Sequence, residues 1–474
     1  MTSSSIYLTI DQASALLQQR SISAVELVEA TLERIEETEP VIHAYALVLA
    51  DQARVAAATA DAERAAGHNR GPLHGIPVGV KDLYYTQGIA TEAGSRALAG
   101  FIPTFDAMAV RRLHAAGMIV IGKTVTHEFA YGVNEPPTRT PWLHDGYPGG
   151  SSAGSGAAVA ARSAFAALGT DTGGSIREPA ALNGLVGLKP TFGLVGRSGI
   201  VPLSQSLDHA GPLTRTVKDC ALMLQALAGY DSGDLSSIRV PREDYLAGLD
   251  ASVSELTVGV ERGFFFREQV RQEVRQAVET VIEELAKEGA RIVEVAMPEL
   301  ELMETVGVTI LLAEASANTR HVLREHASDL DANTRLMFEL GELLPATHYV
   351  TAQRARTVLK DATRNLFTAN GLDALISPTL PSTTYPIDLA LKVDESGEDP
   401  MSAALKYMIP ANVTGLPALT VPCGFSSAGL PIGFQLMGRP FAENSLFRLA
   451  RAYERNHAWH TEVPALDIRD APSP

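Results

Sequence analysis

The sequence predicts an α/β fold, in which helices cover both faces of a large mixed, mostly parallel central sheet. Short apolar runs alternate with amphipathic helical patterns along most of the chain, which is typical of such layered architectures. Hydrophobic residues make up 46% and charged residues 20% of the chain, as expected for a globular protein with a large core. No linker divides the 474 residues, so we expect one domain over residues 1–474.

The first third of the chain changes from helical to strand-like character. Residues 1–65 are expected to be helical, because Ser23 and Glu26 form a capping box and Val28, Leu32 and Ile35 recur at helical spacing. From residue 71 the apolar runs shorten. Residues 76–80 and 118–121 are interpreted as buried strands and residues 106–116 as a helix between them, which begins a core over residues 71–227.

The second half repeats this alternation with more helix. Residues 233–370 are predicted to be mainly helical, with a strand at residues 292–295. Residues 373–474 form the C-terminal part of the core and begin with a strand at residues 375–378. One face of a charged helix that Gly289 can end is apolar, and it carries Val270, Val274, Val278, Val281 and Leu285.

Charge and cysteine content narrow the functional classes. A formal net charge of −16 argues against a nucleic-acid partner, which needs clustered Lys and Arg. Cys220 and Cys423 fit neither a disulfide framework nor a metal-ligand spacing, and we interpret them as buried free thiols. No signal peptide or bilayer-spanning apolar stretch of about 20 residues is found, so we expect a cytoplasmic protein without membrane contact. The sequence predicts no metal and no organic cofactor.

Lys81 ends an apolar run within the segment GIPVGVKD, residues 75–82. Burial disfavours the charged form of a lysine, and a neutral lysine can act as a general base. The simpler interpretation is that its amine reaches water or pairs with Asp82.

Glycine is concentrated around two serine-containing segments. Residues 146–199 hold 13 of the 39 glycines, which indicates tight turns or loops that bring backbone N–H groups to a reacting atom. In GGSSAGSG, residues 149–156, glycines flank Ser151 and Ser152. In GTDTGGSIR, residues 169–177, Gly173 and Gly174 precede Ser175, so one loop can supply both a nucleophile and an oxyanion hole.

Together these three segments resemble the amidase signature family. The resemblance covers residues 71–227 and resumes over residues 373–443. Four further segments match in order, namely GLKPT (187–191), SLDHAGP (206–212), NVTGLP (412–417) and GLPIGFQ (429–435). So many ordered matches make chance an inadequate explanation, and the resemblance implies the amidase signature fold.

The resemblance assigns catalytic roles by position. It implies that Ser175 is the nucleophile, that Ser151 follows a cis peptide bond and relays protons, and that Lys81 is the base. The implied oxyanion hole consists of the backbone N–H groups of Thr172, Gly173 and Gly174. In this mechanism a neutral Lys81 takes a proton through Ser151, and Ser175 then forms an acyl-enzyme that water cleaves. We therefore expect a rate that rises toward alkaline pH.

The expected function is that of a stand-alone amidohydrolase acting on small aryl or alkyl amides, and also on esters, anilides or carbamates. The partner is a small-molecule amide, and the sequence leaves a homodimer open. The expected substrate pocket includes Tyr131, Ala130 and Gly150, and residues 233–370 cover it. Apolar residues of that covering region, including Met303, Val306, Val308, Leu311 and Leu312, suggest an uncharged acyl group or belong to the core.

Three alternatives compete with this interpretation. Residues 150–154 also fit Gly-x-Ser-x-Gly, which would make Ser152 an α/β-hydrolase nucleophile served by a histidine such as His209. Within the family, the glutaminase subunit of a tRNA-dependent amidotransferase would grip free glutamine with an arginine and an aspartate, where this chain has Met337 and Leu405. A non-catalytic binding protein on the same fold would need none of the three catalytic residues.

Overall fold

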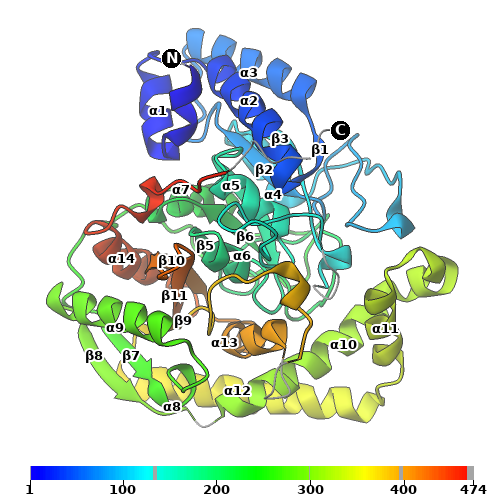
Figure 1. Cartoon of the computed structure of the whole chain (residues 1–474), viewed down its shortest axis with the longest axis vertical. Coiled ribbons are helices and arrows are strands. Elements are labelled where there is room, and N and C mark those ends of the chain that lie inside the picture. The colour runs from blue at the N-terminus through cyan, green and yellow to red at the C-terminus, as the bar shows by residue number, and fades with distance from the viewer. Residues whose placement is uncertain (1, 132–135, 298, 394–398, 467–474) are drawn as a thin grey trace.

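A computed structural model describes residues 2–131, 136–297, 299–393 and 399–466, and its centre is one sheet (Figure 1). Eleven strands occur among these residues, in the order β1-β3-β2-β4-β6-β5-β10-β11-β9-β7-β8. Their bounds are β1 Tyr45–Val48, β2 Pro77–Lys81, β3 Ile119–Thr124, β4 Ala166–Asp171, β5 Val186–Lys189, β6 His209–Thr214, β7 Thr257–Glu261, β8 Arg291–Val295, β9 Ala374–Pro378, β10 Ala418–Phe425 and β11 Pro431–Gly438.

The sheet is mixed, as predicted, but parallel pairing does not predominate. Strand β2 lies parallel to β3 and β4, and β7 lies parallel to β8 and β9, whereas every other neighbouring pair of described strands is antiparallel. The expectation of a mostly parallel sheet was wrong on this point. The physical reason is connection length, because the short link between β10 and β11 forms a hairpin, and hairpins pair strands antiparallel.

Helices cover both faces of the sheet, which confirms the layered prediction. Adjacent residues of a strand point to opposite faces. On β11, a Cβ at Gly433 would meet Ala181, whereas the ring of Phe434 packs edge-on against Tyr453. Helices α6 (Arg177–Leu182) and α14 (Glu443–Glu454) therefore lie on opposite sides. Figure 1 shows α9 and α14 on one side of β9–β11 and α13 on the other.

The remaining helices follow the predicted alternation. The N-terminal helices lie together at the top of Figure 1, and α10 to α12 form a long layer at its base. The bounds are α1 Ile10–Gln18, α2 Ala24–Ile42, α3 Ala50–Ala65, α4 Met108–Ala115, α5 Ala153–Ala160, α7 Val217–Leu227, α8 Arg262–Phe265, α9 Gln272–Lys287, α10 Leu300–Glu325, α11 Ala332–Glu342, α12 Ala346–Asn370 and α13 Pro400–Thr414.

Local signals located these elements well, with two exceptions. The capping box of Ser23 and Glu26 is formed at the start of α2, and α12 ends at Asn370. However, residues 1–65 contain strand β1, and residues 233–370 contain β7 besides the expected β8. Both missed strands have only four or five residues, too few for periodicity to distinguish a strand from another extended segment.

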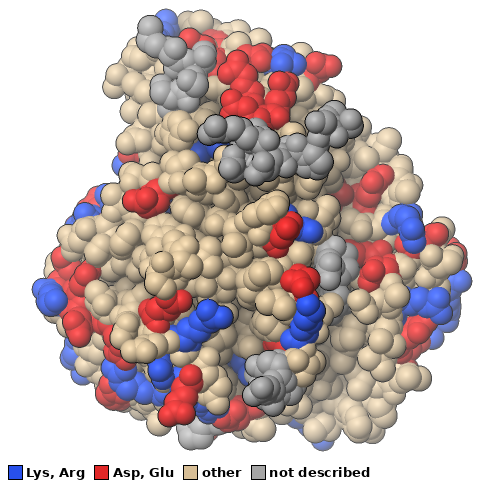
Figure 2. Space-filling model, in the orientation of Figure 1, with Lys and Arg blue, Asp and Glu red and all other residues tan. Residues whose placement is uncertain are grey.

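The surface and the thiols agree with the composition. On the face shown in Figure 2, Lys and Arg are interspersed with Asp and Glu rather than gathered in a basic patch. Cys220 and Cys423 are free and buried, as interpreted from their spacing. None of the described helices is long and apolar enough to cross a membrane.

Candidate active site

Lys81 is the last residue of β2 and is completely buried. Three hydroxyl groups surround its amine. Nζ lies 2.8 Å from Ser151 Oγ, 2.9 Å from Ser152 Oγ and 2.8 Å from Thr170 Oγ1. The alternative that Lys81 pairs with Asp82 was wrong, because the Asp82 carboxylate lies 2.8 Å from Nζ of Lys123 instead.

Burial favours the neutral form of Lys81. Removal from water lowers its pKa well below that of an ordinary lysine, and the charges of Asp171 and Asp208 only partly offset this effect. A neutral amine has two N–H groups and one lone pair. Since the Ser152 hydroxyl faces the carbonyl oxygen of Thr170 at 3.2 Å, it donates there and accepts from Lys81. If the second N–H is given to the Thr170 hydroxyl, the Nζ lone pair is left for the hydroxyl of Ser151.

Ser151 is held by the turn that enters α5. The Gly150–Ser151 peptide bond is cis, as the family resemblance implied. Position 150 requires glycine, because a Cβ there would lie 2.2 Å from Cε1 of His127. The Gly150 N–H donates to Oε2 of Glu178 at 3.1 Å, which ties this turn to α6. Glycine at position 150 thus allows the His127 ring to pack directly against the backbone.

The loop that carries Ser175 follows β4 and is organised by Asp171. The Gly174 N–H donates to Asp171 Oδ1 at 2.9 Å, and the Ile176 N–H donates to Oδ2 at 3.2 Å. The expectation that Gly174 supplies a free oxyanion donor is therefore corrected, because its N–H already has an acceptor. The N–H groups of Thr172 and Gly173 donate to no other described residue.

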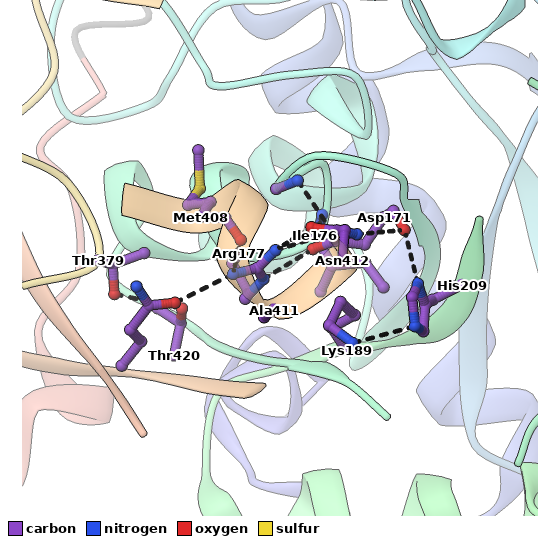
Figure 3. A network of polar contacts seen from close by, with 12 residues as sticks. Asp171, Ile176, Arg177, Lys189, His209, Thr379, Met408, Ala411, Asn412 and Thr420 are labelled. Atoms are coloured by element: carbon purple, nitrogen blue, oxygen red, sulfur yellow. Dashed lines mark hydrogen bonds and ion pairs between the residues drawn. The ribbon is translucent and has the colours of Figure 1, made fainter. Parts of the chain in front are cut away.

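A buried ion pair holds Asp171 in turn (Figure 3). Nε and Nη2 of Arg177 both lie 3.0 Å from the Asp171 carboxylate, in a bidentate arrangement. Arg177 also donates to Asn412 Oδ1 at 2.7 Å, to the Met408 carbonyl at 2.9 Å and to Gln435 Oε1 at 3.0 Å. These contacts join the nucleophile loop to α13 and β11.

Electrostatic interactions in this network favour the ionised form of Asp171. Burial alone would raise the pKa of Asp171, but Arg177, Lys189 and the amide of Asn412 outweigh that effect and hold it below its usual value. Sequence reasoning missed the network. The available signal was that Arg177, Asn412 and Gln435 all lie within the matched segments, although nothing local indicates that they meet.

We expect Arg177→Met to lower the free energy of unfolding by about 3–5 kcal/mol, because it leaves the Asp171 carboxylate buried without its cation. Denaturant titration followed by circular dichroism measures the change. The matched control is Arg54→Met, which breaks an exposed ion pair with Glu29 and should leave stability close to wild type. A loss in Arg177→Met no larger than in this control would contradict a structural role for the network.

One cavity of about 340 Å³ contains both candidate catalytic serines. Ser175 and Ser151 line it, together with every predicted pocket and oxyanion residue, namely Tyr131, Ala130, Gly150, Thr172, Gly173 and Gly174. Of the apolar residues named for the covering region, Val308 and Leu311 also line the cavity. Met303 and Val306 pack in the core instead.

The α/β-hydrolase alternative does not fit the contacts. The Ser152 hydroxyl is engaged by Lys81 and Thr170. His209 Nδ1 lies 2.7 Å from the Leu207 carbonyl oxygen, so it donates there, and Nε2 accepts from Lys189 at 3.0 Å. Both ring nitrogens are used, so His209 does not serve Ser152.

Comparison with known proteins relates this geometry to a family. Residues 26–447 match the family model described as Amidase. An amidase of Pseudomonas putida is 44% identical over 462 residues, an alignment that covers 97% of this chain and 98% of the relative. A glutamyl-tRNA(Gln) amidotransferase subunit of Myxococcus xanthus (strain DK1622) is 41% identical over 481 residues, covering 95% of this chain and 97% of the relative.

A solved structure shares the architecture. The native peptide amidase of Stenotrophomonas maltophilia superimposes with a TM-score of 0.84 at 33% sequence identity. The alignment covers 97% of this chain and 98% of the peptide amidase. The likeness thus extends over nearly the whole chain.

Proposed function

This chain belongs to the amidase signature family, and from that premise we propose that it is a stand-alone amidohydrolase that cleaves small amides through an acyl-enzyme on Ser175. The single observation that carries the proposal is the 2.8 Å contact between Lys81 Nζ and Ser151 Oγ, at the edge of the cavity that also contains Ser175. The proposal is supported because burial lowers the pKa of this amine, which lies beside a hydroxyl that can pass protons.

The proposed reaction balances its protons within these residues. Ser151 gives its proton to the lone pair of Lys81 and takes the proton of Ser175, whose Oγ attacks the amide carbon. The N–H groups of Thr172 and Gly173 stabilise the oxyanion. When the C–N bond breaks, the amine leaves with the proton returned through Ser151. Water then attacks the acyl-enzyme and releases the acid.

Apolar residues around the serines support small aryl or alkyl acyl groups. Besides Val308 and Leu311, the cavity wall contains Met337, Leu405 and Met408. The test is release of ammonia or amine by the purified chain alone from pentanamide, benzamide and a matched p-nitroanilide, p-nitrophenyl ester and aryl carbamate. Turnover of any amide supports the proposal. No turnover across the panel, with no labelling by a fluorophosphonate, would favour a non-catalytic binding protein.

A glutaminase subunit is the second candidate, because relatives named as glutamyl-tRNA(Gln) amidotransferase subunits match over nearly the whole chain. Met337 and Leu405 argue against it. They line the cavity at the positions where the resemblance places the residues that grip glutamine, and neither can pair with a carboxylate or an ammonium group.

We therefore expect kcat/KM for free glutamine to be at least about 100-fold lower than for pentanamide, because the carboxylate of glutamine would lose its hydration without gaining a cation. Ammonia release by the purified chain, followed with a coupled assay, compares the two substrates. Glutamine turnover equal to or faster than that of pentanamide would instead support the glutaminase role.

A further inference from the structure

The cavity has one acidic wall, formed by a buried carboxyl group beside the serines. Glu178 lies in the first turn of α6, is 7% exposed and lines the cavity together with Ser175. Its Oε2 accepts the N–H of Gly150. Within the part of the chain that the structure describes, Glu178 forms no ion pair and its Oε1 receives no hydrogen bond. The carboxyl group therefore has unused acceptor capacity.

An unpartnered hydroxyl occupies the same wall. Tyr147 lines the cavity, and its buried hydroxyl has no hydrogen-bond partner among the described residues. Its ring stacks on Tyr385 with centroids 5.4 Å apart and planes 12° apart. The hydroxyl of Tyr385 is likewise buried and unpartnered in the described structure. Buried polar groups without partners are costly, so this wall is suited to a ligand that supplies hydrogen bonds.

The charges around the cavity have one sign. Glu178 and Glu304 are the charged residues among the described residues that line it, and the lining includes no Lys or Arg. An anionic substrate would therefore be repelled by the carboxylate of Glu178, which forms no ion pair among the described residues. An ammonium group would instead neutralise Glu178, while apolar residues such as Leu311 and Leu405 enclose its carbon chain.

We propose that Glu178 binds a protonated amine carried by the amide substrate, so that the enzyme prefers amino-substituted amides to their neutral and carboxylate isosteres. The inference deepens the proposed amidase function and rests on it. A carboxylate–ammonium hydrogen bond in a buried site is stronger than a neutral one, and it would also remove the cost of an unpaired charge.

The protonation of Glu178 gives the preference a pH dependence. Burial raises the pKa of Glu178 to about 7, against the lowering effect of the Gly150 N–H, and the charge of Asp171 raises it further. The phenols of Tyr147 and Tyr385 face the same carboxyl group and stay neutral, since burial raises the pKa of both. Glu178 is thus protonated below about pH 7 and anionic above it, so ammonium binding strengthens as the pH rises through 7.

Three primary amides of matched chain length test the proposal. 4-Aminobutanamide carries an ammonium group with a pKa of about 10, like that of lysine, so its charge stays constant between pH 6 and 8. Pentanamide replaces that group with a methyl, and glutaramic acid replaces it with a carboxylate. At pH 8 we expect kcat/KM for 4-aminobutanamide to exceed that for pentanamide about 10-fold or more, with glutaramic acid the poorest. The ratio of the first two should fall toward pH 6.

Glu178→Gln removes the charge and keeps an oxygen that can accept the Gly150 N–H. We expect it to abolish both the 10-fold ratio and its pH dependence. The matched control is Glu301→Gln on α10, which removes an exposed carboxylate paired with Arg267 and should keep the wild-type ratio. A wild-type ratio near one, or a ratio retained in Glu178→Gln, would overturn the inference while pentanamide turnover leaves the amidase proposal intact.

Failure of the amidase proposal can be told apart from failure of this inference. If no amide is turned over, calorimetry still compares binding of 4-aminobutanamide and pentanamide to the wild-type protein. Tighter binding of the ammonium compound that is lost in Glu178→Gln would support the ammonium site. Equal binding of the two would overturn it.

Discussion

Ser175→Ala is expected to lower kcat for amide hydrolysis at least about 10⁴-fold, because it removes the hydroxyl that is proposed to form the acyl-enzyme. The variant should also lose covalent labelling by a fluorophosphonate. Substrate binding should persist, since only one oxygen atom is removed from the cavity wall. Single-turnover kinetics and intact-protein mass spectrometry measure the two effects.

The matched control is Ser152→Ala, which directly follows the proposed cis-serine relay in the chain. The Ser152 hydroxyl contacts Lys81 and the Thr170 carbonyl, so its loss perturbs the lysine without removing the nucleophile. We expect this variant to retain fluorophosphonate labelling at Ser175. Labelling that is lost in Ser152→Ala but kept in Ser175→Ala would mean that the nucleophile has been assigned to the wrong serine.

Lys81→Met is expected to lower kcat about 10²- to 10⁴-fold, which is the usual contribution of a positioned general base. Methionine fills a similar volume in this fully buried place, so the loss reports the amine rather than a cavity. Steady-state kinetics with pentanamide measures the change. Near-wild-type amide turnover in Lys81→Met would contradict the proposed base.

The pH dependence of kcat/KM tests the role of Lys81 as the base independently of how far kcat falls in Lys81→Met. The base works only when neutral, so wild-type kcat/KM should fall as the pH drops below the pKa of Lys81 and level off above it. Because burial lowers that pKa, this limb lies well below the value of about 10.4 for a free lysine. Lys81→Met should lack the limb.

Lys189→Met provides the matched control for a buried lysine. Lys189 also ends a strand, is completely buried and forms no ion pair among the described residues, but its amine contacts His209 rather than a serine. In Lys189→Met, kcat/KM should still fall at lower pH as it does in the wild type. Loss of the limb in this variant as well would show that the titration does not belong to Lys81.

Much of the fold followed from short-range signals. The capping box of Ser23 and Glu26 begins α2, and four of the five residues of the predicted apolar face lie on α9, whereas Val270 precedes its first residue. Such signals depend on neighbours within one or two turns, so sequence contains them in full. Strands β1 and β7 were not predicted, because these short strands are stabilised by pairing with neighbouring strands rather than by a residue pattern of their own. The expected predominance of parallel pairs was wrong because the direction of pairing depends on the connections between strands, as the β10–β11 hairpin shows.

The candidate site likewise has features that follow from local sequence and features that depend on long-range packing. The amino-acid order shows which residues stand next to which glycines, and the family resemblance singles out Ser175, Ser151 and Lys81. The contacts of each residue, in contrast, depend on how distant parts of the chain pack together. Ser151 and Thr170 reach Lys81 from 70 and 89 residues away, and Asp171 takes the N–H of Gly174 because Arg177 and Asn412 fix its carboxylate.

The acidic wall of the cavity is likewise a tertiary property. Glu178 follows the nucleophile loop directly in sequence, yet its lack of a cation depends on helices contributed by residues more than 100 positions away. Hydrogen bonding and burial act between atoms that packing brings together, whatever their separation along the chain. For that reason the sequence singled out the residues of the candidate site, whereas the contacts of Lys81, the N–H donors of the loop before Ser175 and the charge of the cavity wall depend on the folded structure.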